Sequence, residues 1–287
     1  MKRSAPVQEI PVKRWSDFEE VLRWLDRWRA VLVAAGKRGL YEPRFRGLGN
    51  GEWGLENTLE RSYPAERSDQ TLNLVSYYQK VSASKPAIET LTGKRWGAIP
   101  RVDQFKRRLE ENKSQWLDMF LGSRPSVYEY LIYLRHHGFP SPLLDWTASP
   151  YVAAFFALDI IAKDAKNVCI YALLQDLIYG GGSDAHMFFV GRYVQSHPRH
   201  FLQQCDYSMC VELKRGDYLF LPHEEGVAGA LGPGGKLFKY VIPATERRTA
   251  LEHLDQMNIN EYSLFGSEDA LIRTIARREC LFRGWRV

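Results

Sequence analysis

The residues whose types and spacing could serve a reaction gather in one stretch, Leu134 to Leu158, with the sequence LRHHGFPSPLLDWTASPYVAAFFAL. Asp145, Thr147 and Ser149 occupy alternate positions there, at the start of a helix predicted over residues 148–158. A helix start that carries hydroxyl groups also presents backbone N–H groups, and together they suit a polar or phosphorylated ligand. The same residues equally fit a helix start that is only capped by its hydroxyls.

A turn with two prolines leads into these residues. Pro140 and Pro142 disfavour a helical conformation at the positions that precede them. We therefore expect a helix over Ser126 to His137 to end at Gly138. Residues 143–147, LLDWT, are then expected to form a strand or a tight loop.

The remaining elements follow from hydrophobic periodicity and from helix caps and turn residues. Helices are predicted over residues 16–36, 102–122, 245–256 and 267–280, with Ser16 as the cap of the first. Strands are predicted at Phe45-Arg46 and over residues 167–174, 210–214, 217–226 and 236–243, and a loop over residues 179–189. No repeat or linker divides the chain, so we expect a single α+β domain with a helical N-terminal part.

Composition narrows the function classes without choosing one. The 287 residues carry a formal net charge of +5, a mild basic excess that is compatible with nucleic-acid contact. No secretory signal is recognisable, and no apolar run approaches the ~20 residues of a membrane helix, which predicts a cytoplasmic protein without membrane contact. The 4 cysteines are scattered and are expected to be free thiols.

Several motifs together resemble the FRG domain family. They are Phe45-Arg46-Gly47, Arg61 in LERSY, the central stretch, HEEG at 223–226 and NINEYSLFGSEDALIRTIARRE at 258–279. Family members usually have Gly-Leu-Pro-Thr-Pro where this chain has Gly-Phe-Pro-Ser-Pro, so both prolines and a hydroxyl are kept. The resemblance implies an FRG domain over residues 40–287, preceded by a helical segment, residues 1–39, that packs on it.

The motif order also resembles, more distantly, the ADP-ribosyltransferase superfamily. That resemblance implies a split β-sheet core and NAD as a substrate. It assigns NAD binding to Arg46, with Gly47, Arg61 and Asp145 beside it, ordering of the site to Thr147 and Ser149, and catalysis to Glu224 or Glu225. These side chains are expected to line one cleft.

The chemistry of that superfamily requires these residue types. Cleavage of the bond between nicotinamide and ribose builds positive charge on the sugar, which a carboxylate stabilises. A guanidinium offers several donors in a fixed fork to the phosphates of a dinucleotide. The resemblance therefore implies transfer of ADP-ribose to a macromolecular acceptor, and the basic balance favours DNA or RNA over protein.

The biological role of such an enzyme and a second function, binding without catalysis, both remain to be considered. Such enzymes are often bacterial toxins or anti-phage effectors, in which case a neutralising partner protein is expected. The alternative is a module that binds nucleotides or nucleic acid without turnover, using its aromatic and basic side chains for stacking and phosphate contacts. Release of nicotinamide from NAD distinguishes the two.

Each candidate residue also has a structural interpretation. Arg46 fits a buried ion pair with Asp145, and the HEEG glutamates fit a solvated turn after a strand. His136 and His137 fit the C-terminal end of a helix, where an imidazolium is favoured.

A zinc site is a further, weaker alternative. The segment HPRHFLQQCDYSMC offers His197, His200, Cys205 and Cys210, whose types suit zinc but whose spacing does not match a usual zinc motif. We expect no metal in the candidate site.

Overall fold

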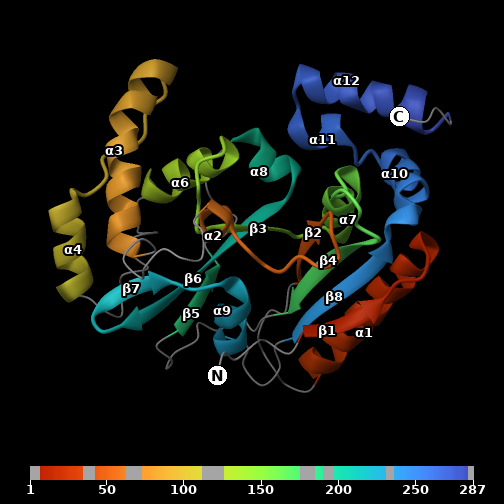
Figure 1. Cartoon of the computed structure of the whole chain (residues 1–287), viewed down its shortest axis with the longest axis horizontal. Coiled ribbons are helices and arrows are strands. Elements are labelled where there is room, and N and C mark those ends of the chain that lie inside the picture. Colours follow the sequence, from red (N-terminus) through yellow and green to blue (C-terminus); the bar gives the residue numbers. More distant parts are fainter. Residues whose placement is uncertain are drawn as a thin grey trace.

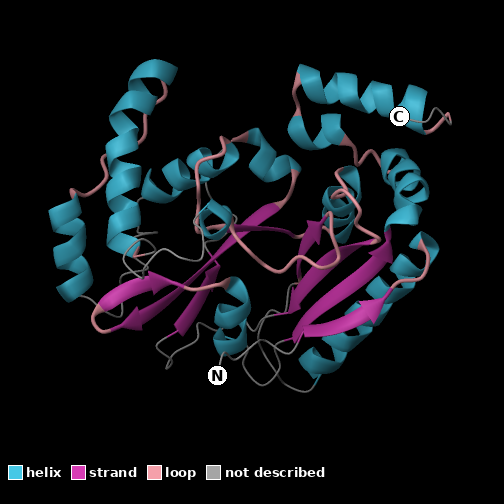
Figure 2. Ribbon diagram, viewed as in Figure 1, coloured by secondary structure: helices cyan, strands magenta, loops and turns pink. Residues whose placement is uncertain are grey.

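The computed structural model describes residues 7–34, 43–62, 73–111, 126–174, 185–189, 197–230 and 236–283. The fold is mixed α+β, with one sheet and helices packed against both of its faces (Figures 1 and 2). Within the described ranges the sheet has 8 strands in the order β1-β8-β4-β2-β3-β6-β5, and β7 pairs with β6. The strands are β1 (Val7–Pro11), β2 (Arg44–Leu48), β3 (Leu144–Thr147), β4 (Asn167–Leu174), β5 (Ala185–Phe189), β6 (Cys205–Lys214), β7 (Asp217–Phe220) and β8 (Lys236–Pro243).

The helices cover the two halves of the sheet separately. They are α1 (Phe18–Ala34), α2 (Thr58–Ser62), α3 (Leu74–Thr92), α4 (Val102–Glu111), α6 (Ser126–His136), α7 (Pro150–Asp159), α8 (Pro198–Leu202), α9 (His223–Ala230), α10 (Arg247–Gln256), α11 (Glu261–Phe265) and α12 (Glu268–Ala276). A π-helical turn, Arg277–Leu281, continues α12. Among the described helices, none combines the length and the apolar character needed to cross a membrane.

The sheet is almost divided in its middle. β2 and β3 meet at one register pair, Phe45 with Thr147, whereas β2 pairs along its whole length with β4 and β3 with β6. We call this junction of β2 and β3 the seam. Helices α1, α7 and α10 share one core with β2, β4 and β8, and helices α3, α4 and α6 share another with β6 and β7. A third core lies on the opposite face of the sheet and includes residues on both sides of the seam.

Gly47 allows α7 to pack directly on β2. A Cβ atom at this position would lie 1.8 Å from the carbonyl oxygen of Ala153 and 2.7 Å from the backbone nitrogen of Ala157. Such contacts are with helix backbone, which cannot move aside as a flexible side chain can. The close spacing of β2 and α7 therefore depends on the absence of a side chain at Gly47.

Replacing Gly47 by alanine is therefore expected to lower the free energy of unfolding by about 2 to 3 kcal/mol, as overpacking does in well-packed interiors. Chemical denaturation measures this change. Gly93→Ala is the control, because Gly93 has φ +70° and open space around it, and its replacement should cost about 1 kcal/mol. An equal or smaller loss for Gly47→Ala would contradict the packing argument.

Most predicted elements are present. The helix predicted over Ser126 to His137 is α6, which ends at His136, and the chain turns away at Gly138, where φ is +83°. Asn167–Leu174 is β4, as predicted, and the LLDWT segment contains β3. Part of the helix predicted over 102–122 is α4, and residues 112–122 lie outside the described residues.

Three predictions of local structure are wrong. Residues 185–189 belong to the predicted loop but form β5, because they pair with β6. HEEG does not extend the strand before it: β7 ends at Phe220 and α9 begins at His223. Ser16 does not cap α1 but lies inside a 3-10 turn, Trp15–Asp17, which precedes the helix. The N-terminal segment also contributes a strand, β1, that pairs in parallel with β8.

Candidate functional site

Two arginines of β2 hold the two sides of the seam together. The Nε atom of Arg44 donates to Oδ2 of Asp206 at 2.6 Å in a buried ion pair. The Nη1 atom of Arg46 donates to the backbone carbonyl of Asp145 at 2.8 Å. The Nε atom of Arg46 is buried and has no hydrogen-bond partner among the described residues. Arg46 thus reaches across the seam and keeps a donor unused.

The structural alternative for Arg46, an ion pair with the Asp145 carboxylate, does not form, because Arg135 takes both oxygens of that carboxylate. Arg135, in the last turn of α6, donates from Nε to Oδ1 at 2.9 Å and from Nη2 to Oδ2 at 2.6 Å. Its Nη1 atom donates to Thr58 Oγ1 of α2 at 2.6 Å. Arg135 therefore links α6, β3 and α2 at the seam; Figure 1 shows where these three elements lie.

The charged side chains at the seam shift one another's pKa values. Burial lowers the pKa of Arg46 to about 10, the charge of Asp145 opposes this, and the charges of Arg135 and Arg61 lower the pKa further. Burial also opposes ionisation of Asp145, but the charge and hydrogen bonds of Arg135 lower the pKa of Asp145 to about 2. Asp145 is therefore ionised and offsets part of the charge of Arg135 and Arg46, and the carboxyl groups of Glu60 and Glu224, described below, lie near the same arginines.

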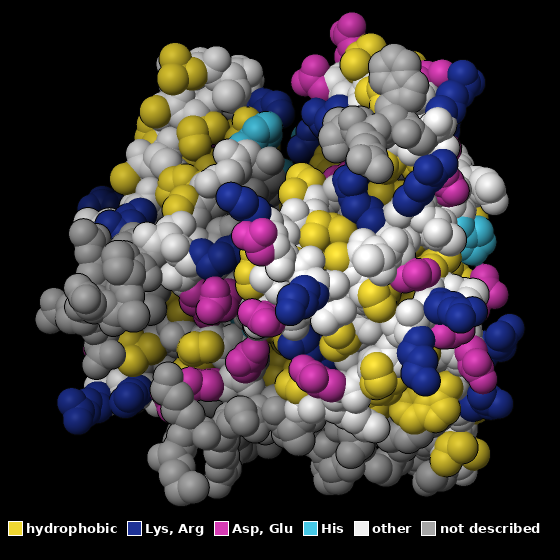
Figure 3. Space-filling model, turned by 45° about the vertical axis from the view of Figure 1, so that its right-hand side comes forward, with side chains coloured by type: hydrophobic (Ala, Val, Ile, Leu, Met, Phe, Trp, Pro, Cys, Tyr) yellow, Lys and Arg dark blue, Asp and Glu magenta, His cyan; other side chains and the backbone are white. Residues whose placement is uncertain are grey.

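The basic character is local. Figure 3 shows Lys and Arg side chains interspersed with Asp and Glu side chains over the middle of one face, without a broad basic surface there. Any preference for an anion at the seam must therefore come from the nearby guanidinium groups.

Helix α2 brings a carboxyl group that sequence reasoning missed. Asn57 and Glu60 form a reciprocal cap, in which Glu60 N donates to Asn57 Oδ1 at 2.9 Å and Asn57 N donates to Glu60 Oε2 at 2.8 Å. The other oxygen, Oε1, is buried and has no hydrogen-bond partner among the described residues. Burial raises the pKa of Glu60 to about 7, with Asn57 and Arg61 acting against the rise and Glu56 and Glu224 adding to it. Glu60 can therefore exchange a proton near neutral pH.

The first turn of α9 supplies a second carboxylate. Leu55 N donates to Oε1 of Glu224 at 3.4 Å, and Gly54 makes room for this approach, since a Cβ there would lie 2.4 Å from the same oxygen. Burial raises the pKa of Tyr171, which is the register partner of Arg46, and the charges of Cys169 and Glu224 add to the rise. Glu224 thus lies on the same face of the sheet as Arg46.

The two glutamates of HEEG do not occupy equivalent positions. Adjacent residues of an α-helix point about 100° apart, so Glu225 cannot share the position of Glu224. The backbone N–H of Glu225 donates to the carbonyl of Pro222 at 3.0 Å. Of the two predicted catalytic carboxylates, the structure brings Glu224 toward the residues at the seam.

The hydroxyls of Thr147 and Ser149 serve the backbone. Thr147 Oγ1 donates to the carbonyl of Gln203 at 2.8 Å and accepts from Ser149 N at 3.1 Å. Ser149 is the N-cap of α7 and accepts from Val152 N at 3.3 Å. Thr147 shares a face of the sheet with Phe45, so it lies on the face opposite Arg46. Among the described residues both hydroxyls contact backbone groups, and no hydrogen bond joins either of them to Arg46.

Of the other predicted residues, one lies away from Arg46 and one lies near it. Gly47 faces α7, away from Arg46, and its place in the motif is explained by packing. Arg61, in α2, is exposed, and its charge acts on the pKa of both Arg46 and Glu60. Arg61 therefore belongs with the residues at the seam.

The histidines and cysteines do not form the sites considered for them. Burial lowers the pKa of His136 to about 4, so it is neutral at pH 7 and not an imidazolium at the helix end. Its Nε2 atom lies 3.0 Å from Tyr207 Oη. Cys205 and Cys210 belong to different cores on opposite faces of the sheet, and no cluster of metal-ligating side chains occurs in the described ranges. The zinc alternative therefore lacks its ligand set.

The two-proline turn holds α2 at the seam. Ser141 N donates to Thr58 Oγ1 at 3.0 Å, and Leu59 N donates to the carbonyl of Ser141 at 3.1 Å. Tyr77 Oη donates to the carbonyl of Pro140 at 3.1 Å. The turn therefore positions the helix that carries Glu60.

Residues 42–166 match the family model described as the FRG domain. The match supports the FRG family for this segment, which runs from just before β2 to just before β4. It contains Arg46, Glu60, Arg135 and Asp145 and ends before Glu224. Neither a curated protein nor a solved structure matches the chain.

Proposed function

We propose that the seam binds NAD and that the protein transfers ADP-ribose from it to a macromolecular acceptor. The observation that carries this proposal is the gathering of Arg46, Arg61 and Arg135 with two carboxyl groups, Glu60 and Glu224, where β2 and β3 separate. A dinucleotide has a pyrophosphate for the guanidinium groups and a ribose for a carboxylate. The split sheet core that the superfamily resemblance implies would place both at this junction.

The arginines divide the binding of the pyrophosphate among them. Arg46 has an unused Nε donor, and Arg61 is exposed beside it. Arg135 is already engaged with Asp145 and Thr58, so it contributes its charge and fixes the site in place. Guanidinium groups bind phosphate oxygens through charge-assisted hydrogen bonds, which are stronger than neutral ones.

The two carboxyl groups suit different parts of the reaction. The bond between C1′ of the ribose and the nicotinamide nitrogen breaks, and nicotinamide leaves as a neutral molecule with the electron pair. Glu224 stabilises the positive charge that develops on the ribose. The acceptor then forms a bond to C1′ and gives its proton to Glu60, whose pKa of about 7 suits a general base at neutral pH.

Replacing Arg46 by lysine tests whether the site needs the several hydrogen-bond donors of the Arg46 guanidinium group. Lysine keeps the positive charge and loses the second donor direction, so nicotinamide release should fall by a factor of roughly ten to a hundred, the value of one or two charged hydrogen bonds. Chromatography of nicotinamide released from NAD measures this rate, and denaturation checks that the seam still folds. Arg101→Lys is the control, since that side chain is 81% exposed. Equal rates for both variants would contradict the assignment of Arg46.

Binding of a nucleotide without turnover is the second candidate, favoured by the engagement of Thr147 and Ser149 in backbone contacts. A binding module needs the arginines and has no use for Glu60 or Glu224. If the wild-type protein binds NAD and releases no nicotinamide, this candidate replaces the transferase.

A further inference from the structure

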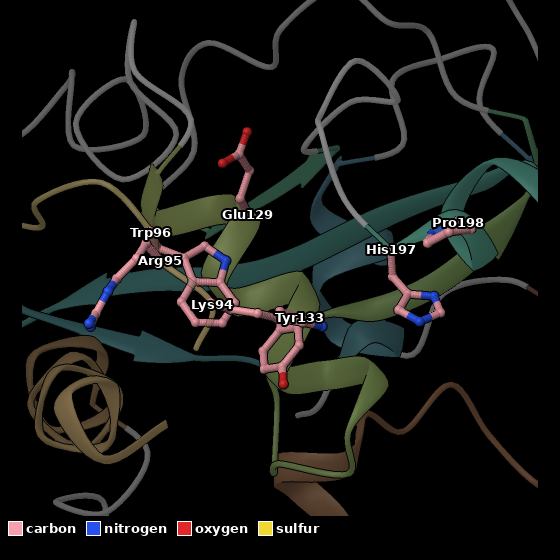
Figure 4. A pocket seen from close by; sticks show the side chains of 7 residues that line it. All are labelled: Lys94, Arg95, Trp96, Glu129, Tyr133, His197 and Pro198. Atoms are coloured by element: carbon pink, nitrogen blue, oxygen red, sulfur yellow. The ribbon is translucent and has the colours of Figure 1, made fainter. Parts of the chain in front are cut away.

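A pocket of about 430 Å³ lies on the outer side of α6, away from the residues at the seam. Three segments form it: the loop after α3 gives Lys94, Arg95 and Trp96, helix α6 gives Glu129 and Tyr133, and the start of α8 gives His197 and Pro198. Figure 4 shows Trp96 and Tyr133 side by side, His197 across from them, and Arg95 extending away from the rings. The volume is within the range of small-ligand sites.

The aromatic rings of the pocket are packed against one another. The ring centroids of Trp96 and Tyr133 are 4.6 Å apart, and those of Tyr133 and His137 are 4.3 Å apart. Trp96 also lies 4.9 Å from Tyr130, a residue of the core beneath. These contacts hold the rings in fixed orientations, so a planar ligand can stack on them without first ordering the side chains.

The charges of the pocket favour an anionic ligand. The Nζ atom of Lys94 lies 4.6 Å from the centroid of Tyr133 and already occupies the position that a cationic ligand would take over that ring. The Arg95 side chain is 74% exposed and lies at the limit of an ion pair, 4.0 Å from Glu89. Two cations therefore flank the rings, and among the described residues that line the pocket Glu129 is the only acidic one.

We propose that this pocket binds one nucleotide, with its base stacked on Trp96 and its phosphate between Lys94 and Arg95. Base stacking and a basic flank are the two features that nucleotide and single-strand binding sites share. The carboxyl group of Glu129 can accept hydrogen bonds from the amino group of a base. The nucleotide is either free or one unit of a single-stranded nucleic acid.

The position of the pocket relates it to the seam. Helix α6 carries Tyr133 to the pocket and Arg135 to Asp145, and the ring of His136 on the same helix lies 6.0 Å from the ring of His197. A strand bound in the pocket would therefore contact the same helix, α6, that carries Arg135 to the seam. The role of the bound strand as the ADP-ribose acceptor rests on the proposed function. Binding of the strand in the pocket does not depend on it.

Fluorescence anisotropy with a labelled single-stranded oligonucleotide of mixed sequence, without NAD, tests the pocket. Trp96→Leu keeps an apolar side chain over the core and should weaken binding about tenfold, the lower part of the range for loss of one stacked base. Arg95→Glu should weaken it at least about fivefold, with a smaller dependence on salt. The matched control is Arg283→Glu, because Arg283 is 70% exposed and also pairs with a glutamate, Glu279.

Competition by unlabelled mononucleotide separates the two sources of the ligand. Displacement of the oligonucleotide at equal nucleotide concentration indicates a site for a free nucleotide, and much weaker displacement indicates a site on a strand. Equal affinities of the Trp96→Leu, Arg95→Glu and Arg283→Glu variants would overturn the proposal, as would absence of binding to the wild-type protein. Because the assay contains no NAD, its outcome is independent of whether the seam releases nicotinamide.

Discussion

Replacing Arg277 by methionine is expected to lower the free energy of unfolding by about 3 to 5 kcal/mol, the loss typical of a buried ion pair that loses one partner. The Nη2 atom of Arg277 donates to Oε1 of Glu261 at 2.6 Å and to Oδ1 of Asp159. The three side chains are only 13%, 5% and 15% exposed, so water cannot replace the lost guanidinium. Glu261 already has a second oxygen, Oε2, that is buried without a partner among the described residues.

This network joins the C-terminal helices to the segment that matches the FRG family. Asp159 is the last residue of α7, and Glu261 begins α11. Arg247 supports the same junction by donating to the carbonyls of Leu158 and Asp159 at 2.9 and 2.8 Å. Loss of Arg277 should therefore loosen α11 and α12 from α7.

Urea denaturation of both variants measures the effect, with Arg283→Met as the control. Arg283 pairs with Glu279 at 2.9 Å, but both side chains are more than half exposed, so its replacement should change stability by less than about 1 kcal/mol. If Arg277→Met proves as stable as Arg283→Met, the buried network does not hold the C-terminal helices.

Replacing Glu60 by glutamine is expected to reduce ADP-ribose transfer to an acceptor more than it reduces nicotinamide release. Transfer should fall by roughly 10² to 10⁴, the usual contribution of a general base, whereas binding of NAD should change little. Glutamine preserves the reciprocal cap with Asn57, because an amide oxygen accepts the same backbone hydrogen bond. Helix α2 should therefore keep its position, and the loss would report the proton transfer.

The same substitution should make the protein more stable at high pH. The pKa of Glu60 is about 7 in the folded protein against 4.5 for the free side chain, so folding favours its protonated form. That stabilisation is complete below pH 4.5 and is lost as the pH rises through 7. At pH 8 the buried charge opposes folding by on the order of 3 kcal/mol, and glutamine removes this penalty.

Thermal denaturation at pH 5 and pH 8, with Glu56→Gln as the control, measures the pH effect. Glu56 is exposed and precedes the same cap, so its replacement should have nearly equal effects at both pH values. A Glu60→Gln variant that gains no stability at pH 8, or that transfers ADP-ribose at the wild-type rate, would contradict the assignment of Glu60 as a buried general base.

The sequence predicted those elements whose ends are determined by nearby caps, turn residues and apolar runs. Gly138 ends α6 because a left-handed residue is needed there, and Ser149 caps α7 because its hydroxyl precedes Pro150 and an apolar run. Asn167–Leu174 is a strand because it is continuously apolar and rich in residues that favour strands. These predictions required no knowledge of distant contacts.

Contacts between distant segments explain what the sequence did not reveal. Residues 185–189 look like the end of a glycine-rich loop and become β5 only because β6 offers an edge for pairing. Arg135 stands beside two more conspicuous histidines, and its role depends on Asp145 and Thr58, which approach it only in the fold. No local pattern distinguishes it from a surface arginine.

Glu60 is different, because a local signal for it existed. The sequence Asn57-Thr58-Leu59-Glu60 has the spacing of a reciprocal helix cap, which predicts both α2 and a fixed carboxyl group. Its burial beneath the seam and its raised pKa could not be predicted, since they depend on the docking of α2 against the two-proline turn.

A crystal structure of the Glu60→Gln variant soaked with NAD tests the central claim most directly. We expect the pyrophosphate within hydrogen-bonding distance of Arg46 and Arg61, and the nicotinamide ribose beside the Glu224 carboxylate. NAD bound at another part of the surface, with the Arg46 side chain still contacting only protein, would contradict the assignment of the seam as the substrate site.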